Sequence, residues 1–470
     1  MPRRLFHTIA AMSMNAKYQP GSIGEMVAVS LPMVVSFACD TVMIFTDRIF
    51  LSKLGPQGMS AAMAGGLSVF VLMAFFLGLI GYTTALVAQY YGAGKKGSCS
   101  LSLMQAVIVA CVAYPVILAL VPVAHWVFSI SGIDLIELKQ QKQYFNILVL
   151  GAILPLLRHA LSAFFTGIGR TRVVMIAAVM AMLVNVGLNY IFVFGKFGCP
   201  SMGIKGAALG TVIATSCAVV YLLVVYLSPK LNREFLTRVN FRFDKDVMGK
   251  LWRFGCPGGV EMLFNLLAFT AMVFVLHSEG VVAAAATTIV FNWDMVTFIP
   301  LLGIEIGVTS LVGRYMGEQN VDVVKRVVVS GLKMGMVYAV GMMVVFIFFP
   351  VSLVYFFEPN HADVIFNQAV PLAIAMIKLV AFYVTAQAVL MVFIGALRGA
   401  GDTMWAMRIS VGIHWVILVI LYVMLKVNDA TVYQSWLVLV IVFMVLSITP
   451  FLRYQSGRWK SIQVINSVGD

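Results

Sequence analysis

Two carboxylates interrupt the first long apolar stretch of the chain, residues 31–62. Asp40 and Asp47 are seven residues apart there, in a sequence apolar enough to cross a membrane as one helix. Seven residues are about two helical turns, so both side chains lie on one face, roughly 10 Å apart along the axis. A carboxylate at bilayer depth is costly unless it faces a cavity, pairs with a cation or takes up a proton. The spacing therefore predicts an ion or proton site on this helix.

Further polar side chains interrupt the apolar stretches of the second half of the chain: Glu261, Asn265, Asp294, Glu305, Lys378 and Gln387. Glu261 and Asn265 are four residues apart, so they share one helical face. Asp294 and Glu305 lie about three turns apart in one stretch. Acids at this depth predict a second proton site or a contact for cationic compounds. The alternative is charge balance, with Lys333 or Lys378 pairing with Glu305 and Lys378 pairing with Asp40.

The composition excludes a soluble protein. Of the 470 residues, 61% are hydrophobic and only 11% are charged, which is far more apolar than a soluble globular domain requires. The net charge of +13 would suit nucleic acid, but the excess lies in short loops between apolar stretches, where orientation signals belong. The six cysteines have no spacing typical of a metal site or a disulfide framework. No nucleophile–base motif or phosphate loop indicates an enzyme, and no cofactor is expected.

The apolar stretches predict an all-α membrane protein with twelve transmembrane helices. Each stretch is near or above the length that crosses a bilayer as a helix, and none has the alternation of barrel strands. The predicted spans are residues 23–52, 59–90, 99–124, 143–166, 172–195, 204–227, 250–277, 281–312, 326–356, 366–397, 404–426 and 432–453. Lysines and arginines gather in alternate connections, so both termini are expected in the cytoplasm and the protein in the inner (plasma) membrane. The first helix is expected to act as the insertion signal, because no cleavable signal peptide precedes it.

The two halves of the chain repeat one another. The segment VAQYYG at 87–92 matches VGRYMG at 312–317, and the same offset of 225 residues pairs Pro32 with Pro257. One long charged connection separates the halves. The predicted division is an amino-terminal six-helix lobe at 1–227, a cytoplasmic linker at 228–250 and a carboxyl-terminal six-helix lobe at 251–470. Because each half has six helices, both pseudo-symmetric lobes enter the membrane from the same side, as in parallel-repeat transporters. In such transporters the substrate path lies between the repeats.

An ordered set of motifs runs through this duplicated chain. The set comprises the LP…D…LG pattern of the first span, GIGRTR at 167–172, N-x-x-x-N-Y-x-x-x-x-G at 185–195, MGIKGAALGT at 202–211 and GALRGAGDT at 395–403. With these motifs the chain resembles the multidrug and toxic compound extrusion (MATE) family of the multidrug/oligosaccharidyl-lipid/polysaccharide superfamily. The resemblance covers nearly the whole chain. It implies a secondary antiporter that exports organic, often cationic, compounds in exchange for Na⁺ or H⁺.

The resemblance also assigns roles in the amino-terminal half. The acidic position of the first span falls on Asp47, and its polar partners fall on Asn185, Asn189 and Thr211. Their oxygens could complete a Na⁺ shell beside Asp47, because hard cations prefer oxygen ligands. If there is no ion site here, the same three side chains simply form hydrogen bonds between helices. One branch of the family has a carboxylate at the position of Asn189, and Asp40 is expected to supply that charge here.

The carboxyl-terminal half departs from the family pattern. Another branch carries a glutamate at the position of Asn265 and an aspartate at the position of Gln387. This chain lacks both acids, which favours coupling through the amino-terminal half.

The expected mechanism is a rocking of the two halves that alternates access to a central path. Na⁺ or H⁺ from outside would neutralise Asp47, and a bend of the first helix at Pro32 would help release the exported compound. Both ions remain candidates, because an aspartate with oxygen neighbours serves either. The alternative is a lipid-linked oligosaccharide flippase of the same superfamily, for which Lys378 and Arg158 are the supporting cations. The expected partners are small-molecule drugs and the lipid bilayer, and a monomer suffices because the fold is already duplicated.

Overall fold

The computed structural model describes residues 18–53, 55–130, 132–359 and 364–465, and within these ranges all regular structure is helical. In chain order the helices are α2 (Ile23–Ser52), α3 (Pro56–Gly81), α4 (Thr83–Gly92), α5 (Lys96–Ala119), α6 (Val121–Ile130), α7 (Leu135–Leu150), α8 (Ile153–Gly167), α9 (Thr171–Phe194), α10 (Ile204–Tyr226), α11 (Pro229–Phe235), α12 (Lys245–His277), α13 (Val281–Gly317), α14 (Val321–Phe348), α15 (Pro350–Tyr355), α16 (Val364–Ala400), α17 (Thr403–Lys426), α18 (Val432–Leu446), α19 (Thr449–Gln455) and the 3-10 helix η2 (Arg458–Ser461).

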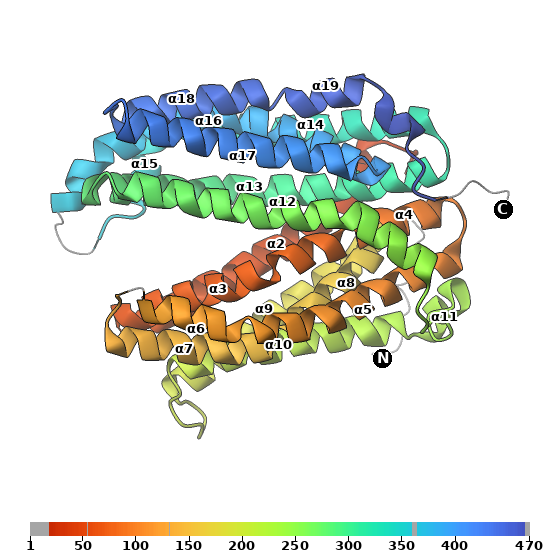
Figure 1. The fold of residues 1–470 in the computed structure, drawn as a ribbon, viewed down its shortest axis with the longest axis horizontal. Coiled ribbons are helices and arrows are strands. Elements are labelled where there is room, and N and C mark those ends of the chain that lie inside the picture. The colour runs from red at the N-terminus through yellow and green to blue at the C-terminus, as the bar shows by residue number, and fades with distance from the viewer. Residues whose placement is uncertain (1–17, 54, 131, 360–363, 466–470) are drawn as a thin grey trace.

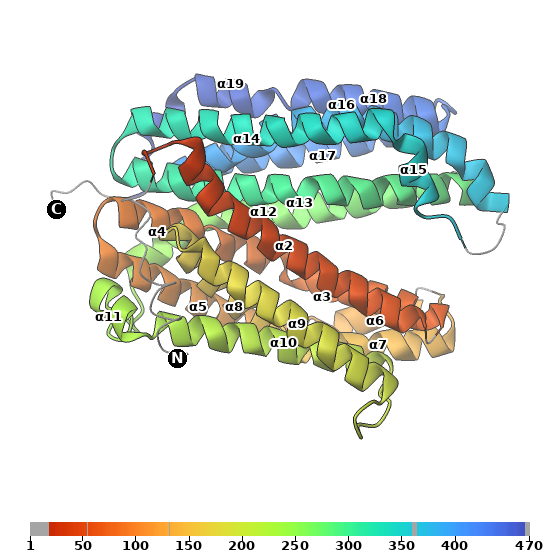
Figure 2. The same cartoon turned by 180° about the vertical axis from the view of Figure 1, so that it is seen from behind.

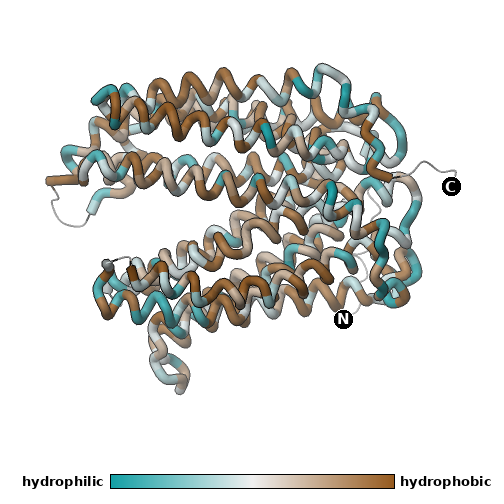
Figure 3. Tube along the Cα trace, viewed as in Figure 1, coloured by the Kyte–Doolittle hydropathy of each residue, from teal (hydrophilic) through white to brown (hydrophobic). Residues whose placement is uncertain are grey.

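These helices make the twelve predicted spans. Eleven spans in the described part of the chain are single helices or consecutive helix pairs that are long and apolar enough to cross a membrane. The pair α7 and α8, bent by 46° at their junction, makes the twelfth. Figure 3 shows hydrophobic residues along the length of the bundle and hydrophilic residues mainly at its two ends. This distribution is the one required of a bundle whose long axis crosses the bilayer.

The helices form two lobes. One hydrophobic core is built mainly from side chains between Met33 and Leu251, and the other from side chains between Met272 and Trp459. The lobes lie side by side at the end that carries α4 and α11, and they diverge toward the end that carries α6, α7 and α15 (Figures 1 and 2). Helix α2 begins and η2 ends at the first of these ends, which we call the basic end because it carries the basic linker at 228–250.

Close contacts between the lobes repeat with the same offset of 225 residues. A Cβ atom on Gly92 would lie 1.9 Å from the carbonyl oxygen of Arg314, and one on Gly317 would lie 2.0 Å from that of Gln89. Gly317 and Arg314 are the counterparts of Gly92 and Gln89. Each half therefore presents the same glycine to the same backbone position of the other half, which confirms the pseudo-symmetry.

Helix α2 continues unbroken through Pro32, the position at which a bend during transport is expected. A proline removes one backbone donor and so frees the carbonyl four residues earlier. The freed carbonyl, that of Ala28, accepts a hydrogen bond of 3.4 Å from the Thr171 hydroxyl at the start of α9. The Ser36 hydroxyl donates to the Pro32 carbonyl at 2.8 Å. Side chains thus replace part of the backbone hydrogen bonding at this point, as is usual for prolines in membrane helices.

Candidate functional site

Asp47 lies at the centre of a hydrogen-bonded cluster built by three helices. It is carried by α2 and is only 8% exposed. Asn189 of α9 donates from Nδ2 to Asp47 Oδ1, and Thr211 of α10 donates from its hydroxyl to Asp47 Oδ2 at 3.2 Å. Asn185, one turn before Asn189, donates from Nδ2 to Thr211 Oγ1 at 3.1 Å. The structure thus brings together the four side chains expected to share one site, and we call them the Asp47 cluster.

The Asp47 cluster has the chemistry of a site for a small hard cation. It offers a carboxylate, two amide oxygens and a hydroxyl, and Na⁺ prefers such oxygen ligands. The Oδ1 atom of Asn189 is buried and makes no hydrogen bond, while Asn185 Oδ1 accepts from Asn189 Nδ2 at 3.3 Å. Among the residues that the structure describes, no lysine or arginine is within salt-bridge distance of Asp47. The carboxylate is therefore held by neutral donors, which leave it able to take up a cation or a proton.

Gly210 makes room for this arrangement. A Cβ atom at position 210 would lie 2.1 Å from Asn189 Oδ1, well inside van der Waals contact. The glycine in the GAALGT segment of α10 therefore leaves room for the Asn189 amide in the orientation that donates to Asp47. In this segment only Thr211 was predicted from the sequence as a site residue, and the role of the neighbouring Gly210 is visible only in the structure.

Asp40 does not join the Asp47 cluster. It points to α8, where Arg158 Nη2 contacts its two carboxylate oxygens at 2.6 and 2.5 Å. This pair corrects two expectations, because Asp40 neither supplies charge beside Asn189 nor pairs with Lys378. The side chains of Asp40 and Arg158 are 34% and 21% exposed, so the salt bridge is only partly buried within the protein.

A second charged cluster lies inside the carboxyl-terminal lobe. Arg398, near the end of α16, contacts Glu261 of α12 at 2.8 Å through Nη2 and Glu305 of α13 through Nη1. The two glutamates are only 3% and 4% exposed. The predicted span ends at residue 397, one residue before Arg398, and Lys333 or Lys378 is the expected partner of Glu305 if that glutamate serves charge balance. The structure corrects the partner: α16 continues through Arg398 to Ala400, and this arginine pairs with both glutamates.

The remaining candidates of this lobe are dispersed. Asn265 donates to the Ser410 hydroxyl of α17 at 2.8 Å, and so holds two helices together. Gln387 is buried, with an Oε1 atom that makes no hydrogen bond, and Asp294 carries a buried Oδ1 atom that also makes none. Lys378 is exposed on α16. These four residues do not form one cluster with the glutamates.

A further network joins the lobes at the basic end. Glu25 in the first turn of α2 is 3% exposed and accepts hydrogen bonds from the Tyr315 hydroxyl at 2.8 and 2.9 Å. The same carboxylate accepts from the backbone N–H of Gly21 at 2.7 Å and lies 3.8 Å from Arg314 Nη1. Sequence analysis did not identify this network. Its signal was the repeated VAQYYG and VGRYMG segments, the second of which contains both Arg314 and Tyr315.

A model of the MatE family matches two segments of this chain, residues 32–191 and 257–424. The segments begin at Pro32 and Pro257, which are 225 residues apart, so the family model matches each half separately. Together they cover well over half of the sequence. The chain belongs to the MatE family. This MatE protein is accordingly an integral membrane transporter and not an enzyme.

Curated relatives and solved structures agree with this assignment. The MatE chain is 26% identical over 406 residues to the multidrug resistance protein NorM of Aliivibrio fischeri, covering 85% of this chain and 86% of the relative. It is 24% identical over 445 residues to the probable multidrug resistance protein NorM of Thermotoga maritima, covering 94% of both chains. A crystal structure of MATE in the straight conformation superposes with a TM-score of 0.84 at 20% identity, covering 94% of this chain and 97% of the other. An outward-facing multidrug resistance MATE family transporter gives a TM-score of 0.83 at the same identity and coverage.

Proposed function

We propose that this MatE protein is a multidrug efflux antiporter that exports organic, often cationic, compounds in exchange for Na⁺ or H⁺. The observation that carries the proposal is the Asp47 cluster, a carboxylate within a membrane span that is held by neutral donors only. Such a carboxylate binds one cationic species at a time. Binding is favourable because the carboxylate without a cation would remain an uncompensated charge at bilayer depth. The names of the NorM relatives supply the substrate class, multidrug compounds. The coupling ion is the only small inorganic partner proposed, and no cofactor is needed.

The exchange follows from competition for this one carboxylate. A Na⁺ ion or a proton that neutralises Asp47 removes the attraction for a cationic compound and changes what Asn189 and Thr211 are bonded to. Because both residues come from other helices, neutralisation alters the packing of α2 against α9 and α10. A ligand shifts a conformational equilibrium only by its different affinity for the two states, and the dependence of these hydrogen bonds on the charge of Asp47 provides that difference.

Alternating access is the second part of the proposal. The lobes diverge away from the basic end (Figure 1) and contact each other closely at Gly92 and Gly317 near that end, so we infer that this form is closed at the basic end. The basic linker and the positive-inside rule favour a cytoplasmic basic end, with both termini in the cytoplasm of the inner membrane. The form described here would then be outward-facing. Export requires a second form in which the lobes separate at the basic end, and one duplicated chain is enough to make both.

The test is efflux of a fluorescent organic cation from proteoliposomes under a Na⁺ gradient or a pH gradient, imposed separately. Wild type should respond to one gradient, and Asp47→Asn should lose that response. The matched control is Asp322→Asn, which neutralises an exposed carboxylate at the start of α14 and should retain wild-type efflux. Gradient-driven efflux that persists in Asp47→Asn would overturn Asp47 as the coupling site and transfer the role to Glu261 and Glu305.

A lipid-linked oligosaccharide flippase is the competing function within the superfamily, and it requires a cationic path. One of its two supporting cations, Arg158, is paired with Asp40 in this structure. Absence of cation transport under either gradient would nevertheless overturn the antiporter and favour the flippase. Flipping of a fluorescent lipid-linked sugar in the same vesicles would then be the next measurement.

A further inference from the structure

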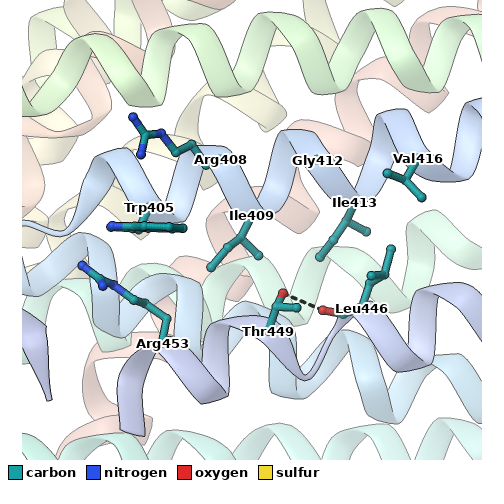
Figure 4. A pocket seen from close by; sticks show the side chains of 9 residues that line it. All are labelled: Trp405, Arg408, Ile409, Gly412, Ile413, Val416, Leu446, Thr449 and Arg453. Atoms are coloured by element: carbon teal, nitrogen blue, oxygen red, sulfur yellow. Dashed lines mark hydrogen bonds between the residues drawn. The ribbon is translucent and has the colours of Figure 1, made fainter. Parts of the chain in front are cut away.

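A groove of about 420 Å³ lies on the surface of the carboxyl-terminal lobe, and none of its lining residues belongs to the Asp47 cluster. It runs between α17 and the break that separates α18 from α19 (Figure 4). Four aliphatic side chains form its walls: Ile409, Ile413, Val416 and Leu446. Neither the helix packing nor the transport mechanism accounts for this groove.

The mouth of the groove carries two arginines around one aromatic ring. The guanidinium carbon of Arg453 lies 4.8 Å from the centre of the Trp405 ring, and that of Arg408 lies 5.4 Å from it. Figure 4 shows the indole between the two guanidinium groups. Arg453 is bound to Asp402 at 2.8 Å, whereas Arg408 is exposed and makes no ion pair with any residue that the structure describes. The mouth therefore keeps a net positive charge that faces outward.

The groove spans the levels of the bilayer that the headgroup and the acyl chains of a phospholipid occupy. Helix α17 begins at Thr403 at the basic end, so Arg408 lies roughly 7 Å along the axis from the helix start, near the expected level of the lipid headgroups. From there the aliphatic wall extends roughly 12 Å further into the bilayer, to Val416. A positive mouth with an aromatic ring at the interface and an apolar wall below it matches the order of groups along a phospholipid.

We propose that this groove binds one anionic phospholipid of the leaflet at the basic end. The phosphate would lie against Arg408, with Arg453 and the Trp405 indole N–H nearby, and an acyl chain would follow the aliphatic wall. An arginine is suited to this role because its planar guanidinium donates two parallel hydrogen bonds to a phosphate. A zwitterionic lipid binds more weakly, because its own ammonium group competes for the phosphate.

Gly412 provides a way to block the groove without removing charge. It lines the groove, and a Cβ atom placed on it would meet nothing within 4 Å. A leucine at this position would extend into the volume that the acyl chain should occupy, without striking the backbone. Gly412→Leu therefore tests the apolar part of the site, and Arg408→Gln tests the charged part.

The experiment measures the melting temperature and the number of lipids retained by the detergent-solubilised protein during titration with phosphatidylglycerol or phosphatidylcholine. Phosphatidylglycerol should bind to wild type, raise the melting temperature and remain bound in native mass spectra. Arg408→Gln should weaken this binding about fivefold, as expected for one basic residue at an anionic surface. Gly412→Leu should abolish the retained lipid. The control Arg172→Gln, which removes an exposed arginine of α9, should bind like wild type.

Two outcomes would overturn the proposal. One is equal retention of phosphatidylglycerol by wild type, Arg408→Gln and Gly412→Leu, because the groove would then play no part. The other is a stabilisation by inorganic phosphate equal to that by the lipid and unaffected by Gly412→Leu, which would indicate a simple anion site. Neither outcome bears on the Asp47 experiment, so the two proposals fail independently.

Discussion

Glu25 and Lys250 occupy equivalent positions in the two halves of the chain, and each bonds the equivalent tyrosine of the opposite half. The Tyr315 hydroxyl donates to Glu25 at 2.8 Å, and Lys250 Nζ donates to the Tyr90 hydroxyl at 3.4 Å. All four residues obey the offset of 225. The two halves are therefore joined at the basic end by two equivalent hydrogen bonds of tyrosine, one with a carboxylate and one with an ammonium group.

Removing the Glu25 carboxylate should loosen this closure. In Glu25→Ala the Tyr315 hydroxyl and the Gly21 N–H lose their acceptor, at a cost of about 1–3 kcal/mol for a buried hydrogen-bonding group. The expected result is a longer distance between the lobes at the basic end, measured by electron–electron double resonance between labels introduced at Arg172 and Lys325. A distance distribution identical to that of wild type would contradict the prediction.

The interlobe glycines predict a related effect by a steric route. Gly317→Ala places a Cβ atom 2.0 Å from the Gln89 carbonyl oxygen, so the two lobes must move apart at this point. We expect reduced efflux and a longer label distance at the basic end. Gly341→Ala is the matched control, because it lies in α14 with nothing within 4 Å of the added carbon. It should be neutral or more stable by up to about 1 kcal/mol through helix propensity. Equal effects of the two variants would refute the steric explanation.

Arg398 should be essential for the stability of the carboxyl-terminal lobe. Arg398→Met leaves Glu261 and Glu305 buried without a cation, and breaking a buried ion pair in this way costs about 3–5 kcal/mol. We expect a lower melting temperature in detergent. The triple variant that adds Glu261→Gln and Glu305→Gln should recover most of the loss, because it removes the uncompensated charges. If Arg398→Met melts at the wild-type temperature, the contacts of this cluster do not stabilise the lobe.

The Asp47 cluster predicts a graded series of transport rates. Asn189→Ala removes a donor that bonds Asp47 directly, whereas Asn185→Ala removes a residue that acts on Asp47 through its hydrogen bonds to Thr211 and Asn189. The initial rate of gradient-driven efflux should therefore fall most in Asp47→Asn, less in Asn189→Ala and least in Asn185→Ala. Circular dichroism and size-exclusion profiles check that each variant is folded. A larger loss in Asn185→Ala than in Asn189→Ala would show that the amides act mainly as interhelical contacts.

The fold was largely predictable because its determinants are local. Each span is a contiguous apolar stretch, and the repeat is visible in residues such as Pro32 and Pro257. The convergence of Asn189 and Thr211 on Asp47 was predicted through the family resemblance, since spacing within one helix does not state which helices are neighbours. The partners of Asp40 and Glu305 were not predictable in this way. The Arg158 and Arg398 contacts depend on how α8 and α16 are rotated about their axes, and a single sequence does not record that angle. The predicted span also ends at residue 397, which placed Arg398 just outside the helix that carries it.

Gly210 limits which substitutions this protein can accept during evolution. Because a side chain at 210 would occupy the place of Asn189 Oδ1, the two positions are not free to vary separately. A lineage that acquires alanine at 210 must also shorten or reorient the residue at 189, and either change would alter the donor that Asp47 receives from α9. Compensating exchange at these two positions should therefore mark the branches of the family that hold their membrane carboxylate as this protein does.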